Sequence, residues 1–187
     1  MQTYATAPGI APFIGVVPDG NGPVVDDSWW ANIPSQQMAT AVTRDLRAWV
    51  SRTFRVNGSW SYAGLSTGGY GAAYLPTVDA QPVHAECGLS GFYDDSQPPI
   101  PPSTSTAGRM MYSPIAHARQ SPSLVFLAHG NRDASTERQT IAYAAALRAA
   151  HHPVIVHVYP GSHRWNVWRP AFEQCLRLVV PAEGGSS

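Results

Sequence analysis

The stretch Trp60–Leu75, WSYAGLSTGGYGAAYL, decides the fold that this sequence predicts. Its first part, 60–65, is typical of a buried strand, and 67–75 of a short helix rich in glycine and alanine. Ser66 stands between them, in the pattern Gly-x-Ser-x-Gly of residues 64–68. Glycines at those positions let the chain turn tightly enough to hold a serine on a strained strand-to-helix corner. Ser66 is therefore a candidate nucleophile, with a merely tight glycine-rich turn as the alternative.

The same alternation of strand and helix extends over most of the chain. Strands are expected at 13–17, 60–65, 84–89, 124–128 and 154–159. Helices are expected at about 38–50, 67–75 and 141–150, and after Gly161. Strands joined through such helices make right-handed crossovers, and hence a parallel sheet. We expect one three-layer α/β domain over 1–187 with a mostly parallel sheet, an irregular loop at about 93–112 and a polar tail at 183–187.

Composition argues against two classes of partner. Twelve arginines balance twelve acidic residues in a chain of 187 residues that has no lysine, so the net charge is zero. Nucleic acid needs clustered positive charge, which this sequence lacks. Its apolar runs, about eight residues long, fall short of the roughly 20 that span a bilayer, so no integral membrane segment is expected. The first residues lack the basic and apolar regions of a signal peptide, and the localisation stays open.

The two cysteines, Cys87 and Cys175, give little information by themselves. They are too few for a disulfide framework and are not spaced for zinc, so no metal site is expected. Cys87 lies in an apolar strand and is most simply a buried small hydrophobe. The redox compartment is therefore undetermined.

A nucleophilic serine needs a base and a group that orients the base. Ligands bind at the carboxyl ends of parallel strands, and His163 and Asp133 each follow a predicted strand. His163 could instead cap a helix, and His129 is its rival as the base. Asp133 could instead be a helix N-cap, with Glu137 as the fallback acid. The order serine, acid, histidine is that of α/β-hydrolases.

Aromatic and acidic residues near these positions are candidates for substrate binding. Trp29, Trp30 and Trp165 could form a platform for an acyl group or a sugar, with core packing as the alternative. Asp94, beside Asp95, could line a pocket, although a role in a turn is the simpler explanation.

Together with the Gly-x-Ser-x-Gly pattern, three later segments resemble the putative-esterase family of α/β-hydrolases, which includes esterase D-like enzymes and the secreted antigen 85 mycolyltransferases. They are 161–168, GSHRWNVW; 89–94, with LSG followed by YD; and 112–114, YSP. The similarity extends from about Phe13 to Leu178. It implies Ser66 as the nucleophile, His163 as the general base and Asp133 as the acid, with the Thr67 N–H as one oxyanion donor.

The chain departs from that family at its start. The family fold has about three strands before the one expected at 13–17, and a loop among them supplies the second oxyanion N–H. The resemblance therefore implies an N-terminally truncated sheet with an exposed edge, which could pair with another chain.

These observations favour a serine hydrolase that cleaves a carboxylic ester of a small molecule, lipid or sugar through an acyl-enzyme. Acyl transfer to an alcohol is a variant of the same chemistry. The reaction needs no metal and no organic cofactor. A catalytically impaired member of the same fold, or a non-catalytic binding relative, is the alternative.

Overall fold

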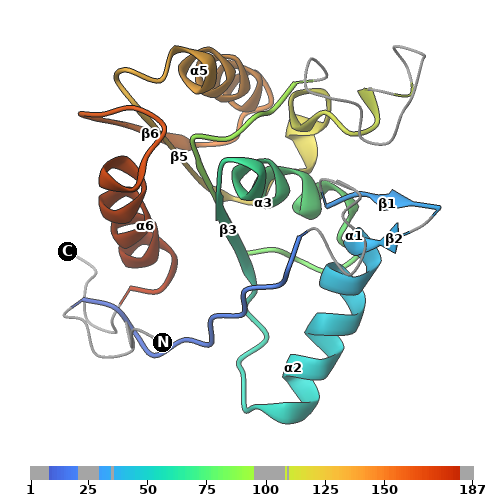
Figure 1. Ribbon diagram of the computed structural model, residues 1–187. Coiled ribbons are helices and arrows are strands. Elements are labelled where there is room, and N and C mark those ends of the chain that lie inside the picture. The colour runs from blue at the N-terminus through green and yellow to red at the C-terminus, as the bar shows by residue number, and fades with distance from the viewer. Residues whose placement is uncertain (1–8, 21–29, 35, 95–107, 109, 182–187) are drawn as a thin grey trace.

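A four-stranded parallel sheet forms the centre of the computed structural model, which describes residues 9–20, 30–34, 36–94, 108 and 110–181. Its strands are β3 (Ser61–Leu65), β4 (Ala85–Leu89), β5 (Leu124–Gly130) and β6 (Val154–Tyr159), in that spatial order. Each strand pairs in parallel with the next. Figure 1 labels three of them, β3, β5 and β6. The parallel sheet expected from the sequence is confirmed for these four strands.

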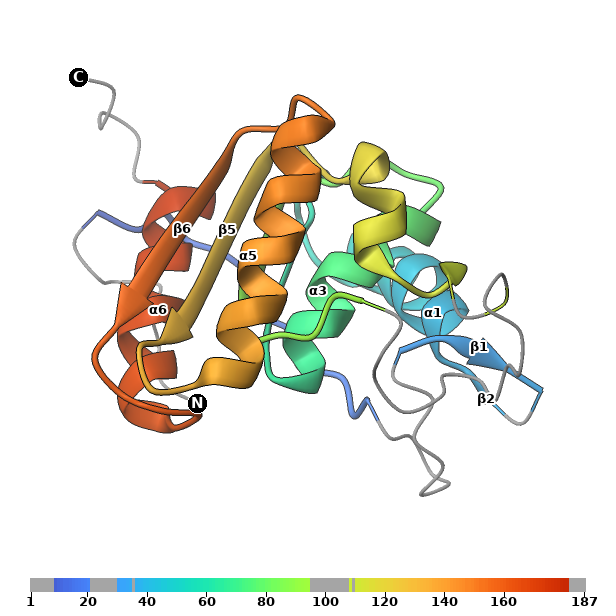
Figure 2. The ribbon, with the colours of Figure 1, turned by 90° about the horizontal axis from the view of Figure 1, so that it is seen from above.

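Helices cover both faces of this sheet. They are α1 (Met38–Thr40), the π-helix η2 (Ala41–Leu46), α2 (Arg47–Thr53), α3 (Thr67–Val78), the 3-10 helix η3 (Pro114–Gln120), α5 (Ala134–Ala149) and α6 (Trp165–Val179). In Figure 2, α5 and α6 lie on opposite sides of β5 and β6. Successive residues of β5 point to opposite faces, so Leu127 packs with α3 and α5, and Phe126 packs with α6. The molecule is thus an α/β protein of three layers.

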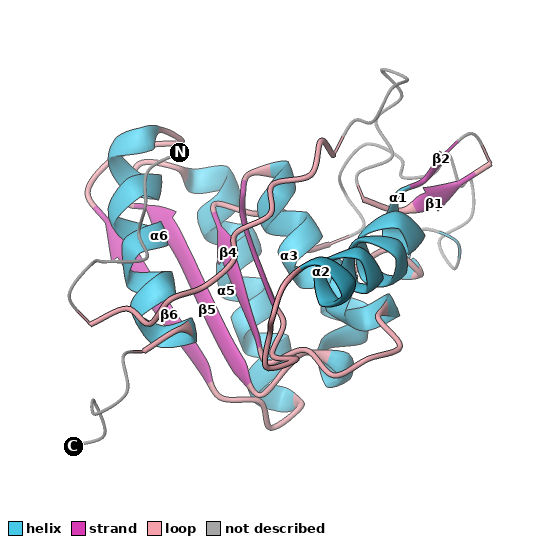
Figure 3. Cartoon of the chain, turned by 90° about the horizontal axis from the view of Figure 1, so that it is seen from below, coloured by secondary structure: helices cyan, strands magenta, loops and turns pink. Residues whose placement is uncertain are grey.

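The prediction of a strand at 13–17 is wrong. In Figure 1 this segment starts near the C-terminus, where Ile10 pairs with Pro181, and runs as an extended loop past β3 towards α3. Figure 3 draws it as a loop too, and most of its side chains are exposed. Pro12 and Pro18 bracket the segment, and a proline nitrogen has no hydrogen to donate to a ladder. Among the described residues, β3 therefore has β4 as its strand partner on one side and none on the other.

Other differences concern the limits of elements. Residue 76 lies inside α3, which continues to Val78, and α5 begins at Ala134 rather than near 141. A two-stranded antiparallel pair, β1 (Asn32–Ile33) and β2 (Gln36–Gln37), was not expected. The expected loop at 93–112 and the polar tail at 183–187 fall largely outside the described residues. No described helix has the length and apolar character needed to cross a membrane.

Cys87 and Cys175 form a disulfide, which corrects the expectation that Cys87 is a simple buried hydrophobe. Both residues are buried among apolar side chains between the sheet and α6. The bond joins β4 to the last helix across 88 positions of sequence. A single pair so far apart in sequence has no spacing signal, so its partnership depends on the fold.

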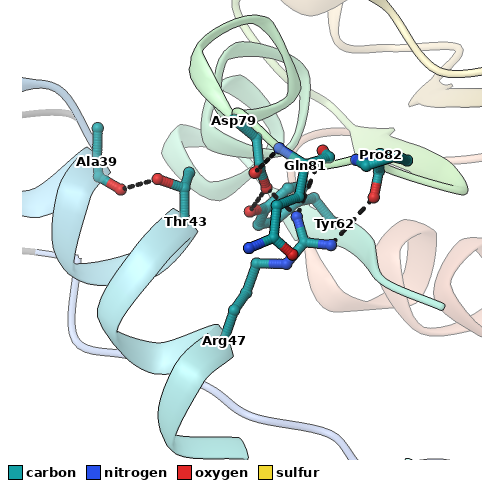
Figure 4. Close-up of polar contacts among 7 residues, drawn as sticks. All are labelled: Ala39, Thr43, Arg47, Tyr62, Asp79, Gln81 and Pro82. Atoms are coloured by element: carbon teal, nitrogen blue, oxygen red, sulfur yellow. Dashed lines mark hydrogen bonds and ion pairs between the residues drawn. The ribbon is translucent and has the colours of Figure 1, made fainter. Parts of the chain in front are cut away.

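A buried ion pair ties α2 to the end of α3 (Figure 4). The Arg47 guanidinium donates to Oδ2 of Asp79, and its Nη2 donates to the Pro82 carbonyl at 3.0 Å. The hydroxyl of Tyr62 on β3 donates to the same Asp79 oxygen at 2.7 Å. The Trp60 ring lies 5.1 Å from the guanidinium carbon, a cation–π distance. Because Asp79 directly follows α3, this cluster fixes where the helix ends.

Candidate active site

Ser66 occupies the sharp corner between β3 and α3 that the glycine pattern predicts. Its φ of 54° and ψ of −120° are strained for a residue with a side chain. A Cβ at Gly64 would lie 2.2 Å from the Gly68 oxygen, and one at Gly69 would lie 2.9 Å from Cα of Gly91. Glycine at these positions is therefore a steric requirement of the corner, which the Ser66 amide stabilises by donating to the Leu89 carbonyl at 2.9 Å.

His163 lies between the other two candidate residues. Its Nε2 is 2.9 Å from Ser66 Oγ, and its Nδ1 is 2.8 Å from Asp133 Oδ2. The loop before it adopts a φ of 150° at Gly161, where a Cβ would meet Asn166 and Val167 at 2.6 Å. The structure thus brings serine, histidine and aspartate into one hydrogen-bonded chain at the carboxyl edge of the sheet.

The loops that carry Asp133 and His163 are bound to each other. The Arg132 amide donates to the Gly161 carbonyl at 2.8 Å, and the Gly161 amide donates to Oδ1 of Asn131 at 3.0 Å. These two bonds join the end of β5 to the end of β6. The contact between the carboxylate and the imidazole therefore rests on fixed backbone.

Asp133 is only 7% exposed, and its carboxylate serves the histidine rather than a helix cap. It stands at the N-cap position of α5, yet its side chain makes no capping hydrogen bond. Burial by itself would raise the pKa of this carboxyl, but hydrogen bonds from Thr136, His163 and Ser135 outweigh it, and the pKa is lowered. The group is therefore an anion at neutral pH, as a partner for a protonated imidazole must be.

Two aromatic rings contact the imidazole, and a third contacts one of these two. Trp168 makes an edge contact with His163 at 4.9 Å between ring centroids, and Phe92 lies 6.4 Å away. Trp165, which is 65% exposed, contacts Trp168 at 5.5 Å. The sequence predicted a substrate-binding role for Trp165 and gave no such role to Phe92. The position of Phe92, three residues after β4 ends, was the available signal.

The remaining candidates are placed differently. Trp29 lies outside the described residues. The Trp30 indole donates from Nε1 to the Thr67 carbonyl at 3.0 Å, and its ring packs against α3. The backbone amide of Asp94 donates to Oε1 of Gln139 at 3.0 Å. His129 is buried, with Nδ1 3.1 Å from its neighbour's carbonyl, so His163 is the histidine that reaches Ser66.

The Thr67 amide lies at the N-terminus of α3. Thr67 is the first residue of α3, and the N–H groups of a first helical turn have no acceptor within the helix. The positive end of the helix dipole adds to their attraction for negative charge. This N–H lies directly beside Ser66 in the chain. Among the described residues, no cluster of side chains could hold a metal ion.

The chain is similar to a known protein family and to several solved structures. The family model described as "Putative esterase" matches residues 9–179. A ferulic acid esterase structure is 22% identical with a TM-score of 0.64, over 81% of this chain and 63% of that one. The fluorophosphonate-binding serine hydrolase F of Staphylococcus aureus is 17% identical with a TM-score of 0.66, over 81% and 67%. MPT51 of Mycobacterium tuberculosis is 16% identical with a TM-score of 0.64, over 82% and 73%.

At these identities the solved structures establish the fold, which is that of the α/β-hydrolases. This chain spans 63% of the length of the ferulic acid esterase. A comparison with curated protein sequences finds no match. The family model, in contrast, covers nearly the whole chain and agrees with the resemblance seen in its motifs. The chain belongs to the Putative esterase family of α/β-hydrolases.

Proposed function

We propose that this protein hydrolyses a carboxylic ester through a covalent acyl-enzyme formed on Ser66. The observation that supports the proposal is the hydrogen-bonded chain from Ser66 Oγ through His163 to the Asp133 carboxylate, with steps of 2.9 and 2.8 Å. A serine hydroxyl becomes an effective nucleophile when a base in hydrogen-bond contact can take its proton. Esterase family membership is consistent with this chemistry.

The first half-reaction transfers the acyl group to the enzyme. Ser66 Oγ attacks the ester carbonyl carbon as its proton moves to Nε2 of His163, and the carbonyl electron pair moves onto oxygen. The Asp133 carboxylate holds the proton on Nδ1 and stabilises the imidazolium. The Thr67 N–H donates to the negative oxygen. When the tetrahedral intermediate collapses, the alcohol leaves with the proton from Nε2.

Water reverses these steps in the second half-reaction. His163 takes a proton from water, hydroxide oxygen adds to the acyl carbon, and Ser66 Oγ leaves with the proton, releasing the acid. An alcohol in place of water would give acyl transfer by the same route. The exposed Trp165 ring and Phe92 offer apolar surface near the imidazole, which suits a small-molecule, lipid or sugar ester.

Reaction with a fluorophosphonate probe tests the proposal directly, because the probe phosphonylates an activated serine. Mass spectrometry should find the adduct on Ser66 in the wild type, and none in Ser66→Ala or His163→Ala. Ser51→Ala, an exposed serine on α2, is the matched control and should react as the wild type does. Absence of an adduct in protein shown to be folded by circular dichroism would refute the enzyme and support the binding relative.

Turnover of a short p-nitrophenyl ester tests whether the enzyme is impaired. Among the described residues we assign one oxyanion donor, the Thr67 N–H. An oxyanion hole with one donor in place of two loses about 3 kcal/mol of transition-state stabilisation, or roughly 10²-fold in rate. We therefore propose turnover well below the roughly 10 s⁻¹ that is the median for enzymes. Ser66-dependent turnover at or above that rate would show that the donor set is complete.

A further inference from the structure

We infer that Trp30 is a positioning residue, which holds the Thr67 amide in the orientation that the oxyanion requires. The inference rests on the proposed function and adds a residue that acts on the reaction from outside the triad. Trp30 was a candidate for substrate contact in the sequence. Its contacts in the structure point to the first turn of α3 instead.

The Trp30 ring fits between two glycines. A Cβ at Gly71 would lie 2.6 Å from Cδ1 and 2.8 Å from Nε1 of the indole, so the ring lies directly on the α3 backbone. A Cβ at Gly20 would lie 2.6 Å from Cζ2, so the far side of the indole touches the N-terminal segment. No larger residue fits at either position without displacing the ring. The indole therefore occupies a slot that is closed on both sides.

The Trp30 backbone is strained. Its φ of 74° lies in the left-handed region, which is rare for a bulky side chain and costs on the order of 1–3 kcal/mol. Such strain persists where other contacts fix the residue. Here those contacts are the slot and one hydrogen bond, from Nε1 to the Thr67 carbonyl at 3.0 Å.

That hydrogen bond acts on the part of the corner between β3 and α3 where the backbone is least restricted by side chains. Three glycines, 68, 69 and 71, lie in the first turn and a half of α3, and glycine backbone is the least restricted of all. The Thr67 carbonyl is the acceptor for residue 71 in the helix, and the indole gives it a second donor from outside. Fixing this carbonyl holds the peptide plane that follows Thr67 and so restricts rotation about ψ of Thr67, the residue whose N–H is the proposed oxyanion donor. Misplacing a catalytic group by about 1 Å can cost roughly 10²-fold in rate.

Simple core packing is the competing explanation, and a matched pair of variants separates the two. Trp30→Phe keeps an aromatic ring in the slot and removes the N–H. Trp60→Phe is the control. Trp30 and Trp60 pack against the same core cluster, but among the described residues Trp60 makes no hydrogen bond to the first turn of α3. Packing predicts similar effects of both changes on stability and on activity.

The experiment measures fluorophosphonate labelling rate, kcat and KM for an ester, and the ¹H–¹⁵N resonance of Thr67. In Trp30→Phe we expect a 10- to 100-fold lower labelling rate and kcat, KM within about twofold, and a shifted Thr67 resonance. Trp60→Phe should leave all four unchanged. Should Trp30→Phe fold poorly, Gly20→Ala presses on the indole from the side away from α3 and should have the same signature.

Two outcomes overturn the inference while leaving the proposed function intact. One is a Trp30→Phe or Gly20→Ala protein that keeps kcat within threefold of wild type. The other is a Thr67 resonance that does not move in either variant. Failure of the wild type itself to react with the probe refutes the proposed function, and the Thr67 resonance then still decides whether Trp30 orients this amide.

Discussion

Replacing Glu86 by glutamine should remove a pH dependence from the stability of this protein. Glu86 is fully buried in β4, and its Oε1 accepts a hydrogen bond from the Tyr143 hydroxyl at 2.8 Å. Among the described residues its second oxygen, Oε2, has no hydrogen-bond partner. Burial raises the pKa of this carboxyl from 4.5 to about 8, although the bond from Tyr143 opposes the shift. The folded protein therefore holds Glu86 protonated at neutral pH.

The sign of the effect follows from counting protons in the two states. Between pH 4.5 and about 8, Glu86 is ionised in the unfolded chain and protonated in the fold. Unfolding then releases a proton, so the free energy of unfolding falls as the pH rises, by about 1.4 kcal/mol per pH unit. Over the whole window the loss is at most about 5 kcal/mol. Above pH 8 this contribution is constant.

Urea denaturation at pH 5, 6, 7 and 8, followed by circular dichroism, measures the effect. Glutamine has the shape of protonated glutamate and can accept from Tyr143, so Glu86→Gln and wild type should differ little at pH 5. By pH 8 the variant should be the more stable by several kcal/mol. Subtracting the two curves cancels every contribution that the wild type and the variant share.

Glu173→Gln serves as the control, because this carboxylate on α6 is half exposed and paired with Arg177 on the surface. Its curve should run parallel to that of the wild type, since exposed pairs contribute less than about 1 kcal/mol. If Glu86→Gln also runs parallel to wild type from pH 5 to 8, Glu86 does not retain its proton in the fold, and the reasoning is wrong.

Three further predictions concern the triad, the disulfide and the ion pair. Asp133→Asn should lower kcat by about 10³- to 10⁴-fold without changing the circular dichroism spectrum, since the imidazole loses its orienting charge. A variant that keeps a tenth of the activity would exclude Asp133 as the acid. Cys175→Ala should lower the free energy of unfolding by about 4 kcal/mol, and denatured wild type should show no free thiol. Detection of two thiols per chain would contradict the disulfide with Cys87. Asp79→Asn should cost about 3–5 kcal/mol by leaving Arg47 buried and unpaired, whereas Arg47→Met with Asp79→Leu should recover most of it. Equal losses in the single and double variants would argue against that account.

Local sequence was sufficient to predict the corner that carries Ser66 and the four strands of the parallel sheet. Gly64 and Gly69 mark the corner because backbone approaches there leave no room for a Cβ, and that constraint is visible as a pattern. Strands β4 and β5 are buried on both faces, and the apolar residues that dominate β5 make such a strand recognisable without its neighbours. The positions after strands then placed Ser66, Asp133 and His163 at one edge, as the topology of parallel sheets requires.

Features that depend on distant partners could not be predicted in this way. The run at 13–17 is as apolar as a strand, but a strand also needs a neighbour with free backbone groups, and local sequence says nothing about that. The placement of the Trp30 ring depends on glycines at 20 and 71, and neither is a near neighbour of Trp30 in the sequence. The disulfide between Cys87 and Cys175 could not be predicted from local sequence either, because 88 positions separate the two residues.

The bond between Cys87 and Cys175 has a consequence for how this protein responds to proteases. Asp133 and His163 both lie inside the covalent ring that the disulfide closes. Ser66 lies outside it, directly after β3, the strand that pairs with the Cys87 strand β4. One cut anywhere within that ring gives two pieces that remain a single molecule, heavier by one water. Such a nick is invisible on a gel without reductant and appears as two bands with it. The protein can therefore lose the continuity of its chain and still keep aspartate and histidine tethered to the strand beside the serine.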